Sequence, residues 1–202
     1  MSHTVATFLE GVEAITMACT LVIGLPTLAL ALAARQRATW VVAGSVTATA
    51  VLMWAKAANY WSVPDDGWVV VPIAVVIAAM FIGAWRADEL PPAAGLGVGV
   101  IAGAIAGWLW RPCVGEQLAK ILNDAESEPF TTAPLMIVYT AGALLPVIVL
   151  AALPHAWPTI RAIVTHRRVA VAGTAFGGLY ALTVLSGQYN DLVGELHRIS
   201  AS

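Results

Sequence analysis

The stretch Gly107-Trp-Leu-Trp-Arg-Pro-Cys-Val-Gly-Glu116 decides how this chain is interpreted. It lies late in a long run of Gly, Ala, Ile and Val, and it places an arginine, a proline, a cysteine and a glutamate within six positions. A charged group inside a membrane span costs at least ~2.5 kcal/mol on insertion scales, so it usually has a partner or a function. Proline frees a backbone carbonyl and breaks or bends the helix, which lipid tolerates only where protein or water meets that carbonyl. The stretch therefore predicts a broken membrane span that serves a function.

The composition is that of a polytopic membrane protein. The chain has 202 residues, of which 59% are hydrophobic and only 11% are charged, whereas a soluble domain carries about 25% charged residues. The long apolar runs favour membrane lipid as the surroundings, and the net charge of −2 leaves no basic surplus, which argues against a nucleic-acid partner.

Six apolar runs are each close to the ~20 residues that a helix needs to cross the hydrocarbon core. They cover approximately residues 8–34, 40–61, 68–85, 93–122, 132–153 and 169–185. Pro26 predicts a kink in the first run. The stretch 157–163 is expected at the membrane interface. Trp and Tyr residues mark several run ends, as they do at membrane–water boundaries; these are Trp40, Tyr60, Trp61, Trp68 and Trp85.

The distribution of charge predicts the orientation. Basic residues follow runs one, three and five, and they are Arg35, Arg37, Arg86, Arg161, Arg167 and Arg168. The opposite loops and the tail are mainly acidic, with Asp65, Asp66, Asp124, Glu126, Glu128 and Asp191. The positive-inside rule then places both termini outside the cytoplasm in a plasma membrane. Glu10 and Glu13 interrupt the start of the chain where a signal peptide would lead into its apolar core, so we expect no cleavage there.

Runs one and four predict an internal symmetry. They begin on opposite sides of the membrane, each contains one cysteine, and each starts a group of three runs. This is the pattern of a 3+3 inverted repeat, whose functional residues meet near the midplane. The expected fold is an all-α polytopic membrane protein with one six-helix domain, 1–202, in halves 8–85 and 93–187. Residues 188–202 have apolar positions at helical spacing and are expected to form an extracytoplasmic amphipathic tail.

The two cysteines, Cys19 and Cys113, allow four interpretations: buried core thiols, a redox pair, metal ligands, or chance. A disulfide would require their Cα atoms to approach to ~4.4–6.8 Å. Exchange would also require water, because the thiolate is the attacking species. The absence of a C-x-x-C motif or paired histidines in the sequence predicts no metal site and no other cofactor.

The residues around Cys113 offer help for such chemistry. Pro112 would break the helix, and such a break could open a cavity. Arg111 could supply positive charge if the break turns its side chain toward the thiol. Glu116, three positions on, would share a helix face with Cys113 and could exchange its proton. Glu10 and Glu13 share a face of run one, either as solvated helix-start carboxylates or as the lining of an entrance.

Several of these residues match a known pattern. In run four they are Gly107-Trp108, Pro112-Cys113-Val114-Gly115, Leu118 and Ile121-Leu122. In runs one and five they are Phe8-Leu9-x-Gly11 with Cys19, and Val138-Tyr139, Gly142 and Leu145-Pro146. This pattern resembles the CcdA/DsbD family of transmembrane thiol–disulfide transporters over about the whole chain. The family flanks its first cysteine with prolines, where this chain has Ala18 and Val22, and its second motif ends in proline, where this chain has Glu116.

The resemblance implies that Cys19 and Cys113 pass reducing equivalents from a cytoplasmic thioredoxin-like donor to an extracytoplasmic thioredoxin-like acceptor, as in cytochrome c maturation. The chain would then act as a thiol–disulfide oxidoreductase without a prosthetic group. The supporting residues would be Arg111, Pro112, Gly115, Glu116, Tyr139 and Pro146. Two other functions stay open: a small-solute or metal-ion transporter, whose path Glu10, Glu13, Glu116 and the thiols would line, and a structural subunit of a membrane complex.

Overall fold

The computed structural model describes residues 3–58, 60, 70–86, 91–109, 116–164, 166–189, 191, 194–195 and 198, with the side chains of Thr16, Ala18, Cys19, Glu116 and Gln117 excepted. This part of the chain is helical and contains no strand, which confirms the all-α prediction. The elements are α1 His3–Glu13, η1 Ala14–Thr16, α2 Ala18–Ala34, η2 Arg35–Arg37, α3 Ala38–Ala57, α4 Val70–Trp85, α5 Pro92–Leu109, α6 Glu116–Asp124, α7 Pro129–Ala143, α8 Leu145–Ala156, α9 Pro158–Val164 and α10 Arg167–Leu185.

Three helical stretches are long and apolar enough to cross a membrane: Thr20–Ala57, Pro92–Leu109 and Arg167–Leu185. A fourth is α7 with α8, if this pair, bent by 70°, forms one span. The outer surface agrees with burial in lipid, because many large apolar side chains point outward, Val75 and Leu179 among them at 63% and 64% exposure. A water-soluble surface rarely carries so much contiguous apolar area.

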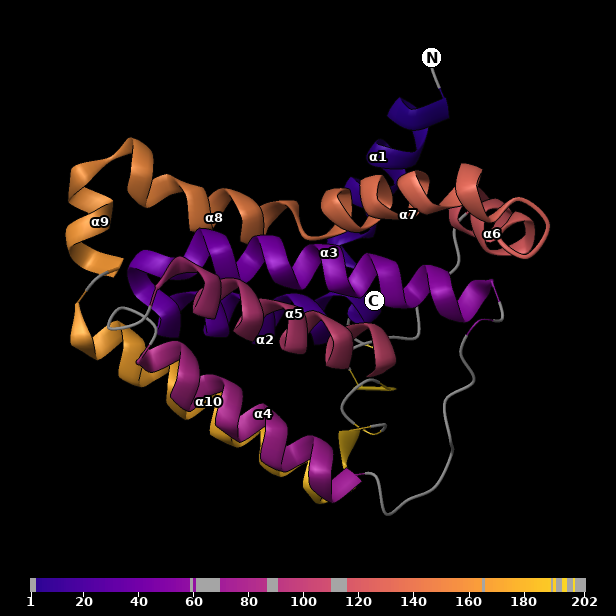
Figure 1. The fold of residues 1–202 in the computed structure, drawn as a ribbon. Coiled ribbons are helices and arrows are strands. Elements are labelled where there is room, and N and C mark those ends of the chain that lie inside the picture. The colour runs from indigo at the N-terminus through magenta and orange to yellow at the C-terminus, as the bar shows by residue number, and fades with distance from the viewer. Residues whose placement is uncertain are drawn as a thin grey trace.

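The bundle is built from helices that alternate in direction (Figure 1). The first stretch reverses at η2, where Arg35 has a φ of 48°, so α2 and α3 lie antiparallel. Ile23 accordingly shares a core cluster with Ala50 and Met53, whereas Ala31 packs with Val42. From there α4, α5, the α7–α8 pair and α10 run alternately back and forth between the two ends of the bundle, with α4 and α10 inclined to α3 and α5.

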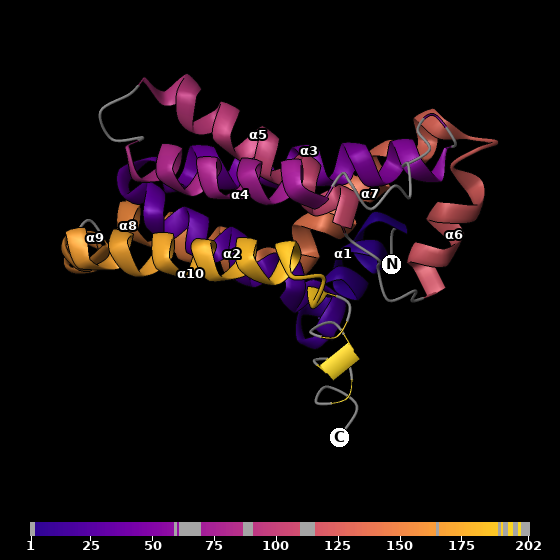
Figure 2. The ribbon, with the colours of Figure 1, turned by 90° about the horizontal axis from the view of Figure 1, so that it is seen from below.

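Hydrogen bonds join the helix ends at both ends of the bundle. At one end, the guanidinium of Arg35 donates to the carbonyl of Trp85, 3.3 Å away. At the other, Lys56 Nζ donates to the carbonyl of Trp108, also at 3.3 Å, and Trp54 Nε1 donates to that of Pro129 at 3.0 Å. Figures 1 and 2 show α9 and α6 at these opposite ends.

Charge is divided between the two ends. The end that holds η2 and α9, here called the basic end, carries the six arginines singled out in the sequence: Arg35, Arg37, Arg86, Arg161, Arg167 and Arg168. The opposite end, where α6 leads into α7, carries Asp124, Glu126 and Glu128. The arginines that the sequence assigned to one side of a membrane therefore gather at one end of the bundle.

The α3–α5 pair is the tightest packing in the bundle. Every fourth residue of α5 from Gly95 to Gly107 is glycine, and this row lies on the backbone of α3. A Cβ built on Gly99 would stand 2.1 Å from the carbonyl oxygen of Val41, and one on Gly103 would stand 2.2 Å from that of Ser45. Small residues let helix backbones approach in this way, which is a common means of helix association in lipid.

Two of the expected runs, one and five, differ from the structure, and run four is described only in part. Run one is not a single helix: α1 crosses α7 steeply, and the chain then turns through η1 into α2 (Figure 1). In run four, α5 ends at Leu109 and α6 begins at Glu116, with residues 110–115 outside the described part. Run five bends by 70° between α7 and α8. The expected tail falls largely outside the described residues.

Candidate functional site

The first cysteine follows the break in run one. Met17 is extended, with φ −74° and ψ 141°, and it precedes the first residue of α2. Cys19 is thus the second residue of a new helix, although its side chain lies outside the described part. The first N–H groups of a helix have no partner within it and carry partial positive charge. The break arises here without the prolines that flank this cysteine in the resembled family.

The second cysteine lies beyond the end of α5. Arg111, Pro112, Cys113 and Gly115 fall outside the described residues, and Glu116 is described only as the first residue of α6. In the sequence, Cys113 follows Leu109 by four positions.

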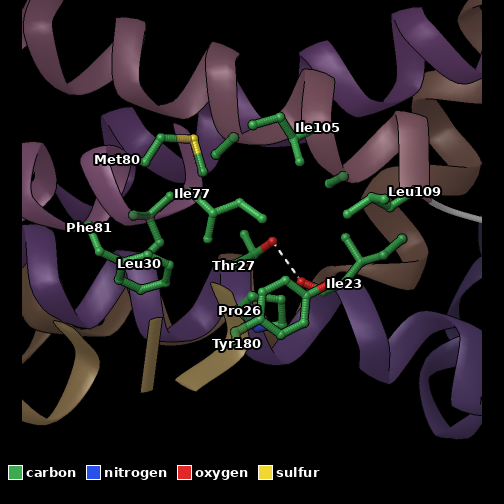
Figure 3. Close-up of a pocket in the computed structure, with 12 residues that line it drawn as sticks. Ile23, Pro26, Thr27, Leu30, Ile77, Met80, Phe81, Ile105, Leu109 and Tyr180 are labelled. Atoms are coloured by element: carbon green, nitrogen blue, oxygen red, sulfur yellow. Dashed lines mark hydrogen bonds between the residues drawn. The ribbon is translucent and has the colours of Figure 1, made fainter. Parts of the chain in front are cut away.

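A cavity of about 40 Å³ lies between α2, α4, α5 and α10, which is enough for a few water molecules. Its lining is mainly apolar: Ile23, Pro26, Thr27, Leu30, Ile77, Met80, Phe81, Ala102, Ile105, Ala106, Leu109 and Tyr180. In Figure 3, Ile23 of α2 and Leu109 of α5 lie near each other at one end of the cavity. Ile23 lies one helical turn after Cys19, so the two cysteine-bearing segments reach the same end of one cavity.

The predicted kink residue, Pro26, lies inside α2 and lines this cavity. A proline has no N–H, so the carbonyl of Val22, four residues earlier, loses its usual donor. The hydroxyl of Tyr180 on α10 donates to that carbonyl at 3.4 Å. The neighbouring Thr27 donates to the carbonyl of Ile23 at 2.7 Å. A side chain of α10 therefore supplies the hydrogen bond that the α2 backbone lacks at Val22, three residues after Cys19.

A second tyrosine reaches the other cysteine-bearing segment. The hydroxyl of Tyr189, just after α10, donates to the carbonyl of Leu109 at 3.2 Å. Leu109 is the last residue of α5 that the structure describes. The rings of Tyr180 and Tyr189 meet edge to face, with centroids 6.5 Å apart.

A carboxylate connects α1 to α6. Glu10 Oε1 accepts a hydrogen bond from the backbone N–H of Leu118 at 3.2 Å. Leu118 is the third residue of α6, so Glu10 satisfies one of the free N–H groups at that helix start. Sequence reasoning preferred a solvated carboxylate at this position. The structure instead gives Glu10 a partner in the helix that follows Cys113, because α1 crosses back over α6 and α7.

Two glycines of the resembled pattern also meet. A Cβ on Gly11 would stand 2.4 Å from the carbonyl oxygen of Tyr139, and one on Gly142 would stand 2.5 Å from that of Phe8. Tyr139 is 2% exposed, and it shares a core cluster with Leu118 and Ile121 of α6. Parts of runs one, four and five that carry the resemblance thus converge at one junction. Its members are Gly11, Leu118, Ile121, Tyr139 and Gly142.

Pro146 occupies the first turn of α8, where a missing N–H costs nothing, just after the bend at Leu144. Thr20, next to Cys19, is 3% exposed, and its hydroxyl has no hydrogen-bond partner among the residues that the structure describes. Local sequence patterns did not indicate Tyr180 or Tyr189, since the role of each depends on a contact between distant segments. The chain has no match among protein-family models, curated proteins or solved structures.

Proposed function

We propose that this chain is a thiol–disulfide exchange protein of the plasma membrane, in which Cys19 and Cys113 pass reducing equivalents between the two aqueous phases. One observation carries the proposal. Ile23, four residues after Cys19, and Leu109, four residues before Cys113, line the same end of one cavity. The two cysteines are 94 positions apart in the sequence, so only the folded bundle can bring their segments together.

The local structure around Cys19 supports the same proposal. Cys19 belongs to the first turn of α2, where the helix N–H groups carry partial positive charge. In the resembled family, prolines flank the first cysteine. In this chain the break between α1 and α2 would open the span in their place. In the same helical turn, the buried Thr20 hydroxyl is a donor that has no partner within the described part of the chain.

The charge distribution supports a direction of transfer. In the proposed topology the helices pass the membrane six times, with the basic end in the cytoplasm by the positive-inside rule. The start of α2 and the end of α5 then both lie toward the extracytoplasmic end. The described arrangement is accordingly one in which the pair would meet an extracytoplasmic acceptor. A second arrangement, open to the cytoplasmic donor, would complete the cycle.

The proposed chemistry balances as two successive dithiol–disulfide exchanges. A thiolate of the donor attacks one sulfur of the Cys19–Cys113 disulfide, and the donor's second thiol resolves the mixed disulfide. The donor is oxidised to a disulfide while Cys19 and Cys113 gain two electrons and two protons. The reduced pair then attacks the disulfide of the acceptor in the same way. A difference of ~30 mV between successive couples gives a tenfold bias.

Proteoliposomes that enclose an oxidised thioredoxin-like protein test the proposal. Reduced thioredoxin and its reductase are supplied outside, and the thiols formed inside are measured after the vesicles are opened. We expect reduction inside with the wild-type chain and none with Cys19→Ser or Cys113→Ser. Reduction that is equal in all three proteins would contradict the proposal. Uptake of a solute or metal ion that survives both cysteine replacements would instead favour the transporter, and loss of complex assembly alone would favour the structural role.

A further inference from the structure

Two tyrosines from the end of the chain each bind one of the cysteine-bearing segments. Tyr180 donates to the carbonyl of Val22, three residues after Cys19. Tyr189 donates to the carbonyl of Leu109, four residues before Cys113. The Val22 carbonyl lacks its usual helical donor because of Pro26, and Leu109 is the last residue of α5 that the structure describes. In lipid, a carbonyl that lacks its helical donor needs another partner.

The two tyrosines also contact each other. Their rings are 6.5 Å apart between centroids and nearly perpendicular, at 89°, which is the favourable edge-to-face geometry. A continuous chain of contacts therefore runs from the α2 backbone through Tyr180 and Tyr189 to the α5 backbone. It lies beside the cavity that Tyr180, Ile23 and Leu109 line (Figure 3).

We propose that Tyr180 and Tyr189 form a clamp that sets the separation of α2 and α5, and that they are thereby positioning residues for the Cys19–Cys113 pair. The part that concerns the pair rests on the proposed function, whereas the clamp itself does not. Release of the two hydroxyl bonds would free the kink in α2 and the end of α5 together. Reversible release of this kind is what movement of the pair between the two aqueous sides requires.

The clamp is tested without the native cysteines. In a Cys19→Ser, Cys113→Ser background, Leu25→Cys and Ile101→Cys place spin labels on outward-facing positions of α2 and α5, which are 44% and 48% exposed. We expect Tyr180→Phe with Tyr189→Phe to broaden or shift the distance distribution between the labels. Tyr60→Phe is the matched control, because Tyr60 is 66% exposed and its ring contacts Trp54 rather than α2 or α5. An unchanged distribution in the double variant would overturn the clamp.

Tyr189→Phe alone provides the same test if the double variant does not accumulate, since it removes one hydroxyl from a partly buried residue after the last long helix. A second measurement addresses the pair in the native-cysteine protein, by equilibrating it with glutathione buffers. Loss of one hydrogen bond changes an equilibrium by about two- to tenfold, so we expect a shift of that size in the midpoint for each Tyr→Phe variant and none for Tyr60→Phe. Shifted label distances without any Cys19–Cys113 disulfide would retain the clamp and reject the proposed function. An unshifted midpoint would reject the positioning role.

Discussion

The carboxylate of Glu10 accepts a hydrogen bond from the backbone N–H of Leu118, 3.2 Å away and 108 positions along the chain. It joins the helix before Cys19 to the helix after Cys113. Leu118 is fully buried, and it packs with Tyr139 and Met136 of α7. A polar contact at this place is costly to remove because a buried N–H of the α6 start would lose its acceptor.

Replacement of Glu10 tests that contact. We expect Glu10→Ala to lower the free energy of unfolding by about 1–2 kcal/mol, the range found for helix N-cap replacements and charged hydrogen bonds. Glu10→Gln retains an oxygen acceptor and should cost less. Glu13→Ala on the same helix is the control, because Glu13 is exposed. Thermal unfolding in detergent and amide exchange of α6 measure the effect, and equal stability of Glu10→Ala and Glu13→Ala would contradict it.

The glycine row of α5 makes a sharper structural prediction. A methyl group at Gly103 would stand 2.2 Å from the Ser45 carbonyl oxygen, so Gly103→Ala must push α3 and α5 apart. Overpacking of this kind typically costs about 1–3 kcal/mol. Gly97 lies on the same helix with nothing within 4 Å of its added Cβ. Gly97→Ala should therefore leave the melting temperature unchanged or raise it slightly, since alanine favours a helix by about 0.5–1 kcal/mol.

The contrast between Gly103→Ala and Gly97→Ala is measured as the shift in melting temperature of the purified protein. A Gly103→Ala protein as stable as Gly97→Ala would mean that α3 and α5 are not in backbone contact at this level. The α5 end that precedes Cys113 would then lack the rigid support that the account assigns to it.

Two threonines of α2 provide a matched comparison near Cys19. Both are buried, but the Thr27 hydroxyl donates to the Ile23 carbonyl at 2.7 Å, whereas no described group accepts from or donates to the Thr20 hydroxyl. Thr27→Val should therefore lower stability by about 0.5–1.5 kcal/mol, and Thr20→Val should be neutral or stabilising. Unfolding transitions of the two variants decide this, and a larger loss for Thr20→Val would show that its hydroxyl has a structural role.

The sequence predicted the apolar helices well, because hydropathy and length are properties of each segment alone. Run two, 40–61, corresponds to α3, Ala38–Ala57, and run six, 169–185, to α10, Arg167–Leu185. The break before Cys19 could not be predicted, since neither proline nor glycine occurs at Ala14–Met17. The contacts that accompany it join distant segments, namely Gly11 with Gly142 and Glu10 with Leu118.

In the candidate site too, local features could be predicted from the sequence, whereas contacts between distant segments could not. Pro26 predicted a kink in run one, which a local rule on proline supports. Nothing local indicated that Tyr180, 158 positions from Val22, would donate to the carbonyl that Pro26 leaves free. Six spans, the 3+3 repeat and the redox pair remain predictions. The resemblance named Gly11, Tyr139 and Gly142 separately, and the structure adds that they meet at one junction with Leu118.

The central claim is that the sulfurs of Cys19 and Cys113 can approach to bonding distance. Mass spectrometry of the non-reduced, protease-digested protein, prepared across a series of glutathione redox buffers, measures this directly. The account predicts a peptide pair linked through Cys19 and Cys113 that appears under oxidising buffers, disappears under reducing ones, and is restored on reoxidation. Both cysteines alkylated as separate thiols under every oxidising condition, in a protein that remains folded, would contradict it.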